Sequence, residues 1–389
     1  MRQPVREALI IEACRTPVGR GHPEKGIFRD IHPADLLGRT FAEVLRRAHL
    51  DPKYVDNVIA GCAHQVSQQA SGITRTAWLT KGLPESAGAT TVDVRCGSGQ
   101  QAANLASLSI ECSINDLVVA GGIEHMGRVG FRVNEGSQQT YGAAFPPELL
   151  QRYPLVPQGV GAEMLADRWE LTREQLDAFA LRSHQRAAAA TRAGAFRREI
   201  FPVSTSEGVH DTDQGIRADT SLDSLGALKP AFRENGRITA GNSSQISDGA
   251  AALLLSCRDA ANRLGLKPRA RMVDQVVLGV DPVTMLTGPI PATRRLLERN
   301  GLGVSDIDAF EVNEAFASVV LGWERELNPD MARVNARGGA IALGHPLGCT
   351  GTRLLTTLLH QLEDQGGELG VVAMCCGGGI GTATLIQRI

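Results

Sequence analysis

Short apolar and β-branched runs alternate with longer stretches of helical periodicity along most of the chain. The predicted elements are strands at residues 8–13, 55–60, 90–94 and 117–120 and helices at residues 31–47, 72–81 and 99–114. Glycine or polar residues follow each strand, and Gly121 is taken as the end of the last one. This alternation is typical of an α/β protein, and it predicts largely parallel strands.

The order of elements repeats in the second half of the chain. Three segments, 55–62, 92–97 and 118–122, resemble the segments 307–314, 334–339 and 371–375 respectively. The separation is about 250 residues in each case, and the matches keep their order, which chance matches in a generic α/β rhythm would not. Two homologous halves are therefore predicted. If they pack as pseudo-symmetric partners, their equivalent turns meet at one cleft.

The residue composition changes between residues 127 and 237, which are richer in Gln, Arg, Pro and Gly than the rest of the chain. Only one helical pair, 161–169 and 172–194, stands out there, and strand signals are weak. We therefore predict an inserted loop domain, a usual place for binding determinants. The predicted domains are an N-terminal half (1–126, with a return segment 238–265), the loop domain (127–237) and a C-terminal half (266–389).

Composition narrows the classes of function. The chain has 389 residues, 43% of them hydrophobic, and its 40 basic and 42 acidic residues give a net charge of −2. This balance favours neither nucleic acid nor a membrane surface as a partner. No apolar run reaches about 18 residues and the first ten residues lack a signal-peptide core, so a cytoplasmic location and no integral membrane contact are expected.

The cysteines and histidines do not suggest a disulfide framework or a metal site. Eight cysteines are spread over the whole length without zinc-type C-x-x-C pairs, which favours reduced thiols. The nine histidines form no i, i+4 pair, and carboxylates do not cluster with them. We therefore expect no metal ion.

Cys96 lies at a predicted turn from strand to helix. Gly97 and Gly99 allow backbone and substrate to approach closely, and the free N–H groups at the start of the helix favour an anion. Such a position is expected to lower the pKa of the thiol and to make it a nucleophile. The alternative is that Cys96 is a small buried apolar residue, the commoner fate of a free cysteine.

The second half contributes further candidates. His345 lies in the glycine-rich turn 338–351, Cys375 precedes three glycines, and Asn313 lies at a predicted strand end. Each also fits a plainer interpretation, since a glycine-rich loop can bind phosphate or simply turn the chain, and Asn313 can cap a helix. Together they supply a nucleophile, a base, an acid and a polarising group.

These residues resemble a known family. The four segments Cys96-Gly97-Ser98, Asn313-Glu314-Ala315-Phe316, Gly344-His345-Pro346 and Cys375-Cys376-Gly377-Gly378-Gly379 resemble, in this order, the signature blocks of the thiolases. The resemblance covers essentially the whole chain. It implies a duplicated α/β fold, with two pseudo-symmetric mixed-sheet halves in a layered α-β-α-β-α arrangement and an inserted loop domain.

The resemblance implies thiolytic cleavage of a 3-oxoacyl-CoA to acetyl-CoA and a shortened acyl-CoA. Cys96 would be the nucleophile, His345 the base that takes its proton, and Cys375 the acid that protonates the leaving enolate. Asn313, through a water, and His345 would form one oxyanion site, and the N–H groups of Cys96 and Gly377 the other. Coenzyme A would be a co-substrate, with no permanently bound cofactor.

The resemblance also places coenzyme A across the loop domain. Arg217 would lie near the adenine, Ser224 and Ser244 near the diphosphate and pantetheine, and Ala240, Ala315 and Phe316 along the pantetheine channel. From the residues alone, an exposed charge at Arg217 and a helix start at Ser224 explain these two positions equally well.

This chain departs from the family pattern at one loop. Some short-chain thiolases carry a His-Met-Gly run where Pro157-Gln158-Gly159 stands here. The segment Glu124-His125-Met126 and the sequence around Cys96 resemble those of degradative thiolases, including thiolases of actinobacterial lipid and sterol breakdown. A substrate with a bulky acyl group is therefore one expectation. His125 itself is interpreted as a satisfied polar residue below the site rather than a substrate contact.

Three rival functions remain. An acetoacetyl-CoA-forming acetyl-CoA acetyltransferase would prefer the shortest substrate. A β-ketoacyl synthase shares the fold, but Cys375 favours a thiolase. A non-catalytic acyl-CoA or sterol carrier would be expected to lose Cys96, His345 or Cys375, and all three are present. The family also implies a homodimer or homotetramer, with acyl-CoA and coenzyme A as the small-molecule partners.

Overall fold

A computed structural model describes residues 6–130, 133, 138 and 140–389. The first five residues of the predicted N-terminal half and positions 131–132, 134–137 and 139 of the predicted loop domain lie outside this range. No helix in the described part of the chain is both long enough and apolar enough to cross a membrane.

The N-terminal half is built from two parts of the chain, one before and one after a long inserted segment. These elements are β1 (Leu9–Arg15), β2 (Gly19–Arg20), α1 (Pro33–Arg47), η1 (Pro52–Tyr54), β3 (Asn57–Gly61), η2 (Ser67–Gln69), α2 (Ile73–Thr80), β4 (Gly88–Val92), α3 (Ser98–Glu111), β5 (Leu117–His125), β8 (Ser247–Ser256) and α9 (Arg258–Leu264). The inserted segment contains α5 (Pro147–Arg152), α6 (Gln158–Arg168), α7 (Arg173–Arg192), β6 (Val203–Thr205), β7 (Gly208–His210) and α8 (Leu222–Gly226).

The C-terminal half follows without interruption. It contains β9 (Ala270–Gly279), α10 (Pro289–Arg299), η4 (Val304–Asp306), β10 (Ala309–Val312), α11 (Ala317–Leu327), α12 (Ala340–Leu343), α13 (Leu347–Gln365), β11 (Leu369–Cys376) and β12 (Ile380–Arg388). Its main elements follow the order of those in the N-terminal half, except that an isolated bridge at Val334 takes the place of β4 and that α12 has no counterpart.

Equivalent strands of the two halves have the same order across the sheet. In the N-terminal half the order across the sheet is β4-β3-β5-β8-β1, and in the C-terminal half it is β10-β11-β12-β9. In the C-terminal half, a parallel bridge joins Phe310 of β10 to Val334. It takes the position that β4 has beside β3 in the N-terminal half. Among the strands of the described residues, the two sets are joined where Leu9 and Ile10 of β1 pair with β9. This repetition agrees with the duplication predicted from the sequence.

The prediction of largely parallel strands is wrong. Only the pairs β3·β4, β3·β5 and β10·β11 are parallel among the described strands of the large sheet, and the other pairs are antiparallel. Strand β8, for example, runs between β1 and β5 with every residue buried. Burial on both faces gives a continuous apolar run in either direction, so the sequence pattern did not distinguish the two.

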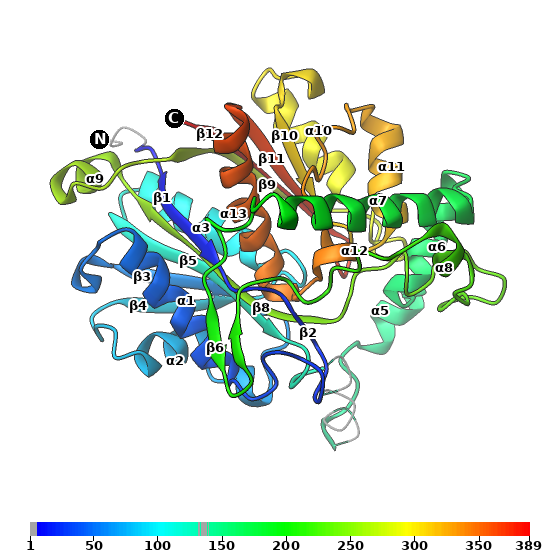
Figure 1. Ribbon diagram of the computed structural model, residues 1–389, viewed down its shortest axis with the longest axis horizontal. Helices are drawn as coiled ribbons and strands as arrows, with labels where there is room; N and C mark the ends of the chain where they lie inside the picture. Colours follow the sequence, from blue (N-terminus) through cyan, green and yellow to red (C-terminus); the bar gives the residue numbers. More distant parts are fainter. Residues whose placement is uncertain (1–5, 131–132, 134–137, 139) are drawn as a thin grey trace.

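The helices divide the molecule into five layers (Figure 1). Helices α1 and α2 cover the outer face of the N-terminal strands, and α10 and α11 cover the outer face of the C-terminal strands. Helices α3 and α13 lie between the two sets of strands and pack against each other. The layered α-β-α-β-α arrangement is therefore confirmed, with its central layer formed by one helix from each half.

Glycine allows the central layer to pack tightly. The prediction that the strand ends at Ala120 is wrong, because β5 continues through Gly121 and Gly122 to His125. A Cβ atom on Gly122 would lie 2.1 Å from Gly348 O, at the start of α13. The glycine therefore marks a close approach of helix to strand rather than the end of the strand.

We predict that Gly122→Ala destabilises the protein by about 1–3 kcal/mol, because the added methyl group overlaps backbone that cannot move without displacing α13. The matched control is Gly226→Ala, since a Cβ atom there would meet nothing within 4 Å. Thermal unfolding of the two variants and the wild-type protein measures the difference. Equal melting temperatures for all three would contradict the close packing.

Candidate active site

Cys96 lies at a sharp turn between β4 and α3. The preceding residue, Arg95, adopts a left-handed conformation with φ 52°, which is unusual for a residue other than glycine. Ser98 closes the turn, because its hydroxyl accepts from Val94 N at 2.9 Å and donates to Arg95 O at 2.6 Å. The thiol is 4% exposed. The strand-to-helix turn predicted from the sequence is therefore present.

His345 occupies the corresponding turn of the other half. Cys96 stands two residues before α3, and His345 stands two residues before α13. Gly344 before it has φ 105°, and a Cβ atom there would lie 2.3 Å from Ser247 Oγ. The same hydroxyl accepts from His345 N at 3.1 Å. Only glycine therefore allows the backbone to bring the imidazole to this place.

The two turns are adjacent in the central layer. Thr352 of α13 donates to Gly99 O of α3 at 3.0 Å, and a Cβ atom on Gly99 would lie 2.6 Å from Gly348 O. Gly348 N in turn donates to Glu124 Oε2 at 2.9 Å. The first turns of α3 and α13 thus meet directly, and each carries its candidate residue on the segment that leads into it.

Hydrogen bonds select the tautomer of His345. Its Nδ1 lies 2.6 Å from Thr350 Oγ1, and that hydroxyl also lies 2.8 Å from Pro346 O, an obligatory acceptor. Thr350 has a single hydroxyl proton, which goes to Pro346 O, so Nδ1 must donate to Thr350. Nε2 then carries the lone pair. It lies 3.3 Å from Asn313 Nδ2, which donates to it.

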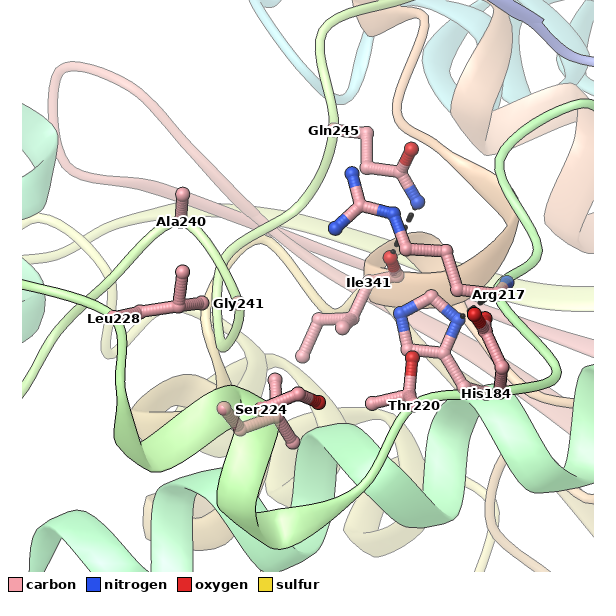
Figure 2. Close-up of a pocket in the computed structure, with 11 residues that line it drawn as sticks. His184, Arg217, Thr220, Ser224, Leu228, Ala240, Gly241, Gln245 and Ile341 are labelled. Carbon is pink, nitrogen blue, oxygen red and sulfur yellow. Dashed lines mark hydrogen bonds between the residues drawn. The ribbon is translucent and has the colours of Figure 1, made fainter.

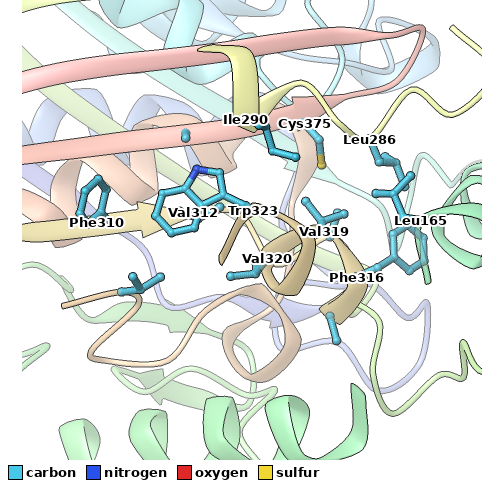
Figure 3. Packing of buried hydrophobic residues seen from close by; sticks show 14 of the residues in the cluster. Leu165, Leu286, Ile290, Phe310, Val312, Phe316, Val319, Val320, Trp323 and Cys375 are labelled. Carbon is cyan, nitrogen blue, oxygen red and sulfur yellow. The ribbon is translucent and has the colours of Figure 1, made fainter. Parts of the chain in front are cut away.

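The loop after β11 brings the second cysteine to the first. A Cβ atom on Gly97, next to Cys96, would lie 2.6 Å from Cys376 Sγ. The backbone N–H of Gly377 acts to lower the pKa of Cys96, and the proximity of Cys96 helps to raise the pKa of Cys375. Cys375 is buried in the apolar cluster of the C-terminal half, and Figure 3 shows it pointing towards Val319 between Ile290 and Leu286. The structure therefore brings the Cys96 turn against the loop that carries Cys375 and Gly377, and His345 against Asn313.

Burial controls the protonation of these groups. It raises the pKa of Cys96 to about 11, although hydrogen bonds from Gly377 N–H, its own N–H and the Gln158 side chain act in the opposite direction. The prediction that the turn lowers this pKa is wrong, because desolvation of the charged form outweighs the donors. Burial also raises the pKa of Cys375. Both thiols are therefore neutral in the free protein near pH 7.

The imidazole is neutral as well. Burial, followed by the positive charge of Arg353, lowers the pKa of His345 to about 3. A neutral imidazole with its lone pair on Nε2 is able to accept a proton, whereas an imidazolium is not. The resting site is thus an uncharged thiol and imidazole pair rather than an ion pair.

A second site lies between α7, α8 and the segment around Ala240. It is a cavity of about 300 Å³ (Figure 2). Its lining residues are His184, Arg217, Asp219, Thr220, Ser224, Leu225, Leu228, Ala240, Gly241, Gln245 and Ile341. Three residues predicted for coenzyme A binding, Arg217, Ser224 and Ala240, are among them.

The other three predicted residues lie together next to this cavity. Ser244 N donates to Ala315 O at 2.9 Å, and Ser243 forms a β-bridge with Phe316. The alternative interpretation of Ser224 as a residue at a helix start also holds. Its hydroxyl and that of Ser221 form a capping box at the start of α8. Ser224 therefore both starts a helix and lines the cavity.

Some residues that organise the site escaped the sequence analysis. The buried carboxylate of Glu124 accepts from Ala63 N, His64 N, Gln69 Nε2 and Gly348 N at 2.8–3.1 Å, and so ties α13 to the N-terminal half. Gln158, noted only as a departure from a family pattern, acts to lower the pKa of Cys96, and its Nε2 would lie 2.9 Å from a Cβ atom on Gly377. A buried charge is costly without partners, so an acidic residue within an apolar strand was the available signal for Glu124.

His125 was interpreted as a satisfied polar residue rather than a substrate contact, and the structure shows it as a buried residue. Its side chain is fully buried, and its Nε2 lies 2.9 Å from Phe28 O. Asp248 approaches its Nδ1 at 3.2 Å. These contacts hold His125 inside the protein and leave it without exposure to a substrate.

Comparisons with known proteins agree with this architecture. The family model of the thiolase N-terminal domain matches residues 8–259, and that of the thiolase C-terminal domain matches residues 266–388. A steroid 3-ketoacyl-CoA thiolase of Mycobacterium tuberculosis is 44% identical over 389 residues, which cover 98% of this chain and 94% of that protein. A 3-ketoacyl-CoA thiolase of Shewanella frigidimarina is 42% identical, covering 99% of this chain and all of that one.

The fold also matches a solved structure. The crystal structure of the acetyl-CoA acetyltransferase of Bacillus anthracis superposes with a TM-score of 0.90 at 36% identity. The match covers 99% of this chain and 100% of that one.

The neutral imidazole predicts a specific acid sensitivity. The unfolded chain protonates His345 below about pH 6.5, whereas the folded protein does so only near pH 3. The unfolded state binds more protons between these values, so stability falls as pH falls from 6.5 towards 3. We predict that His345→Asn loses less stability over this window, by at most about 1.4 kcal/mol per pH unit.

Denaturant unfolding at pH 6.5, 5.5 and 4.5 measures this slope. Cys96→Ala is the control, because that thiol stays protonated throughout the window and its removal leaves the slope unchanged. Parallel slopes for the wild-type protein and His345→Asn would show that the imidazole is not held neutral.

Proposed function

The chain belongs to the thiolase family, and from that premise we propose that it cleaves 3-oxoacyl-CoA thioesters with coenzyme A, releasing acetyl-CoA and a shortened acyl-CoA. The observation that carries the proposal is the close approach of the Cys96 turn to the loop after β11, where a Cβ atom on Gly97 would lie 2.6 Å from Cys376 Sγ. This contact joins the cysteine-bearing loops of two different halves at one point. An acyl-transfer site with one sulfur as nucleophile and another as acid requires this convergence.

In the first step, Nε2 of His345 takes the proton of Cys96, and the thiolate attacks the C3 carbonyl carbon. The tetrahedral oxyanion accepts hydrogen bonds from the N–H groups of Cys96 and Gly377. The bond between C2 and C3 breaks, the acyl group stays on Cys96 as a thioester, and acetyl-CoA leaves as an enolate. Cys375 gives its proton to that enolate, while Asn313 and His345 stabilise the enolate oxygen.

In the second step, the thiol of free coenzyme A gives its proton to the Cys375 thiolate. The coenzyme A thiolate attacks the acyl-cysteine carbonyl carbon, and the bond from that carbon to Cys96 breaks. Cys96 recovers its proton from His345, so each group returns to its starting form. A neutral resting site suits this cycle, because each charge appears only when a substrate is present to receive it.

We propose that residues 127–237 carry much of the coenzyme A contact. The cavity beside Arg217 supports this, since it joins a guanidinium, a hydroxyl at Ser224 and a small apolar surface at Ala240. A nucleotide with phosphates and a flexible apolar arm needs those three kinds of contact. Arg217 is exposed, so its contribution should weaken with salt.

The acyl group is proposed to be bulky, on the basis of the 44% identity with the steroid 3-ketoacyl-CoA thiolase. The similarity to an acetyl-CoA acetyltransferase favours the short-chain alternative. Thiolysis of 3-oxoacyl-CoA thioesters from four carbons to sterol size, with product identification, separates the two. A preference for acetoacetyl-CoA would replace the first proposal by the second.

Replacement of Cys96 and replacement of Cys375 should block different steps of the reaction. We predict that Cys96→Ala lowers kcat for thiolysis on the order of 10³-fold or more, because the acyl-enzyme no longer forms. Cys375→Ala should lose thiolysis but retain exchange of labelled coenzyme A into acetyl-CoA. Exchange breaks no carbon–carbon bond, and His345 gives its proton to the leaving coenzyme A thiolate and takes one back from the incoming thiol. Cys112→Ala, at an exposed thiol, is the control. Normal thiolysis by Cys96→Ala would remove the proposal.

Arg217 should affect binding of the nucleotide rather than chemistry. We expect Arg217→Ala to raise KM for coenzyme A about three- to tenfold, less at high salt, with little change in kcat. A pantetheine thioester lacks the nucleotide and should be turned over equally by variant and wild-type enzyme. Arg192→Ala, at another exposed arginine, is the control. An unchanged KM would exclude Arg217 from the coenzyme A site.

A further inference from the structure

A buried polar ladder joins α3 to the hairpin of β11 and β12. It consists of four fully buried side chains, Gln100 and Asn104 one turn apart on α3, and Thr382 and Thr384 on one face of β12. Thr382 Oγ1 donates to Gln100 Oε1 at 2.5 Å, and Gln100 Nε2 donates to Thr384 Oγ1 at 2.7 Å. Thr384 Oγ1 in turn donates to Asn104 Oδ1 at 2.8 Å.

The directions of these hydrogen bonds are determined. Gln100 Nε2 also lies 3.1 Å from Val372 O of β11, which can only accept, so the amide nitrogen must face this oxygen. The amide oxygen is then left to accept from Thr382. Because the bonds are linked head to tail, they polarise one another, and a displacement of α3 along its axis would break several of them at once.

The polar ladder matters because the apolar part of this contact is smooth. Between Ser98 and Ser107, the buried hydrophobic side chains of α3 all belong to alanine, at Ala102, Ala103 and Ala106. Small side chains form shallow ridges, so they restrict the axial position of a helix only weakly. The hydrogen bonds of the polar ladder supply the restriction that this packing lacks.

The polar ladder lies between the two segments that carry the reacting sulfurs. Gln100 is in the first turn of α3, directly after the turn that carries Cys96. On the other side, Thr382 pairs with Met374 in the antiparallel register, so it stands opposite the residue before Cys375. Each side of the polar ladder is therefore close along the chain to one sulfur.

We propose that Gln100 is a positioning residue, which sets the distance between these two sulfurs by fixing α3 against β11 and β12. The proposal deepens the proposed thiolase function and rests on it for its kinetic part. Cleavage of the carbon–carbon bond uses both sulfurs, whereas exchange of coenzyme A into acetyl-CoA uses Cys96 and His345. This second pair depends on the contact of α3 with α13 at Gly99 and Gly348, which lies outside the polar ladder.

Two variants separate positioning from stability. Gln100→Met keeps the length of the side chain, removes its hydrogen bonds and leaves the Thr382 hydroxyl without its acceptor. Gln100→Met/Thr382→Val also replaces that hydroxyl by an apolar group of similar shape, which recovers stability. The melting temperature should fall by about 2–4 °C in the single variant and lie within about 1 °C of the wild-type value in the double variant. Gln365→Met, at the exposed last residue of α13, is the matched control.

The first readout compares two reactions of the same proteins. In both variants, kcat for thiolysis of a 3-oxoacyl-CoA should fall about ten- to hundredfold, while exchange of labelled coenzyme A into acetyl-CoA falls less than about threefold. Gln365→Met should leave both rates unchanged. A merely structural role would lower thiolysis and exchange together, and thiolysis would recover with stability in the double variant. Either result, or wild-type thiolysis by Gln100→Met, would overturn the proposal.

The second readout needs no substrate. Crystal structures of the wild-type protein and the double variant give the distance between the Sγ atoms of Cys96 and Cys375, which should change by about 0.5–1 Å as α3 shifts. An unchanged distance would overturn the proposal. If the wild-type protein turned over no 3-oxoacyl-CoA, the proposed function would fail, while this distance would still decide the role of Gln100.

Discussion

The close approach of α3 and α13 is the constraint on which the rest of the molecule depends. The N-terminal turns of these helices meet at Gly99 and Gly348, and Gly122 of β5 leaves room for the same contact. No side chain larger than hydrogen fits at these positions without displacing backbone. Because the two helices are equivalent elements of duplicated halves, their contact brings together two turns about 250 residues apart in the chain. Cys96 and His345 lie on those turns.

Around this contact, the protein replaces water with fixed dipoles. Cys96, His345, Asn313 and Cys375 are all nearly or completely buried. Burial would oppose every charge that an acyl transfer creates, and it accounts for the raised pKa of Cys96 and the lowered pKa of His345. In the proposed reaction, the backbone N–H groups of Cys96 and Gly377, with Asn313 beside His345, would stabilise the charges that develop. The site is thus neutral at rest and already arranged for a charged transition state.

Parts of this arrangement were predictable from the sequence. Cys96, Asn313, His345 and Cys375 each stand next to glycine or at a strand end, which marked them as candidates. The repeat matched Cys96 to Gly338, whereas in the structure it is His345 that stands two residues before the equivalent helix. The duplicated path of the strands was likewise visible in the order of the matching segments. These features are local, and a residue's neighbours along the chain determine them.

Other parts depend on contacts between distant segments. Strand direction was misjudged because β8, like other central strands, is buried on both faces and gives no alternation. The pKa of Cys96 was misjudged because burial is a property of the folded protein, whereas the helix start is visible locally. Glu124 and Gln158 were missed as parts of the site because the residues that they act on, Gly348 and Cys96, are far away in the chain. Sequence patterns therefore supplied the candidate reacting groups, and only the structure revealed the contacts between distant segments around them.

The central claim is that Cys96 carries the acyl group between the two halves of the reaction. Incubation of the protein with a 3-oxoacyl-CoA in the absence of free coenzyme A, followed by acid quenching and peptide mass spectrometry, tests it directly. The account predicts one acyl adduct on the peptide that contains Cys96, in an amount equal to the acetyl-CoA released. An adduct on Cys375 instead, or release of acetyl-CoA with no acylated cysteine, would contradict it.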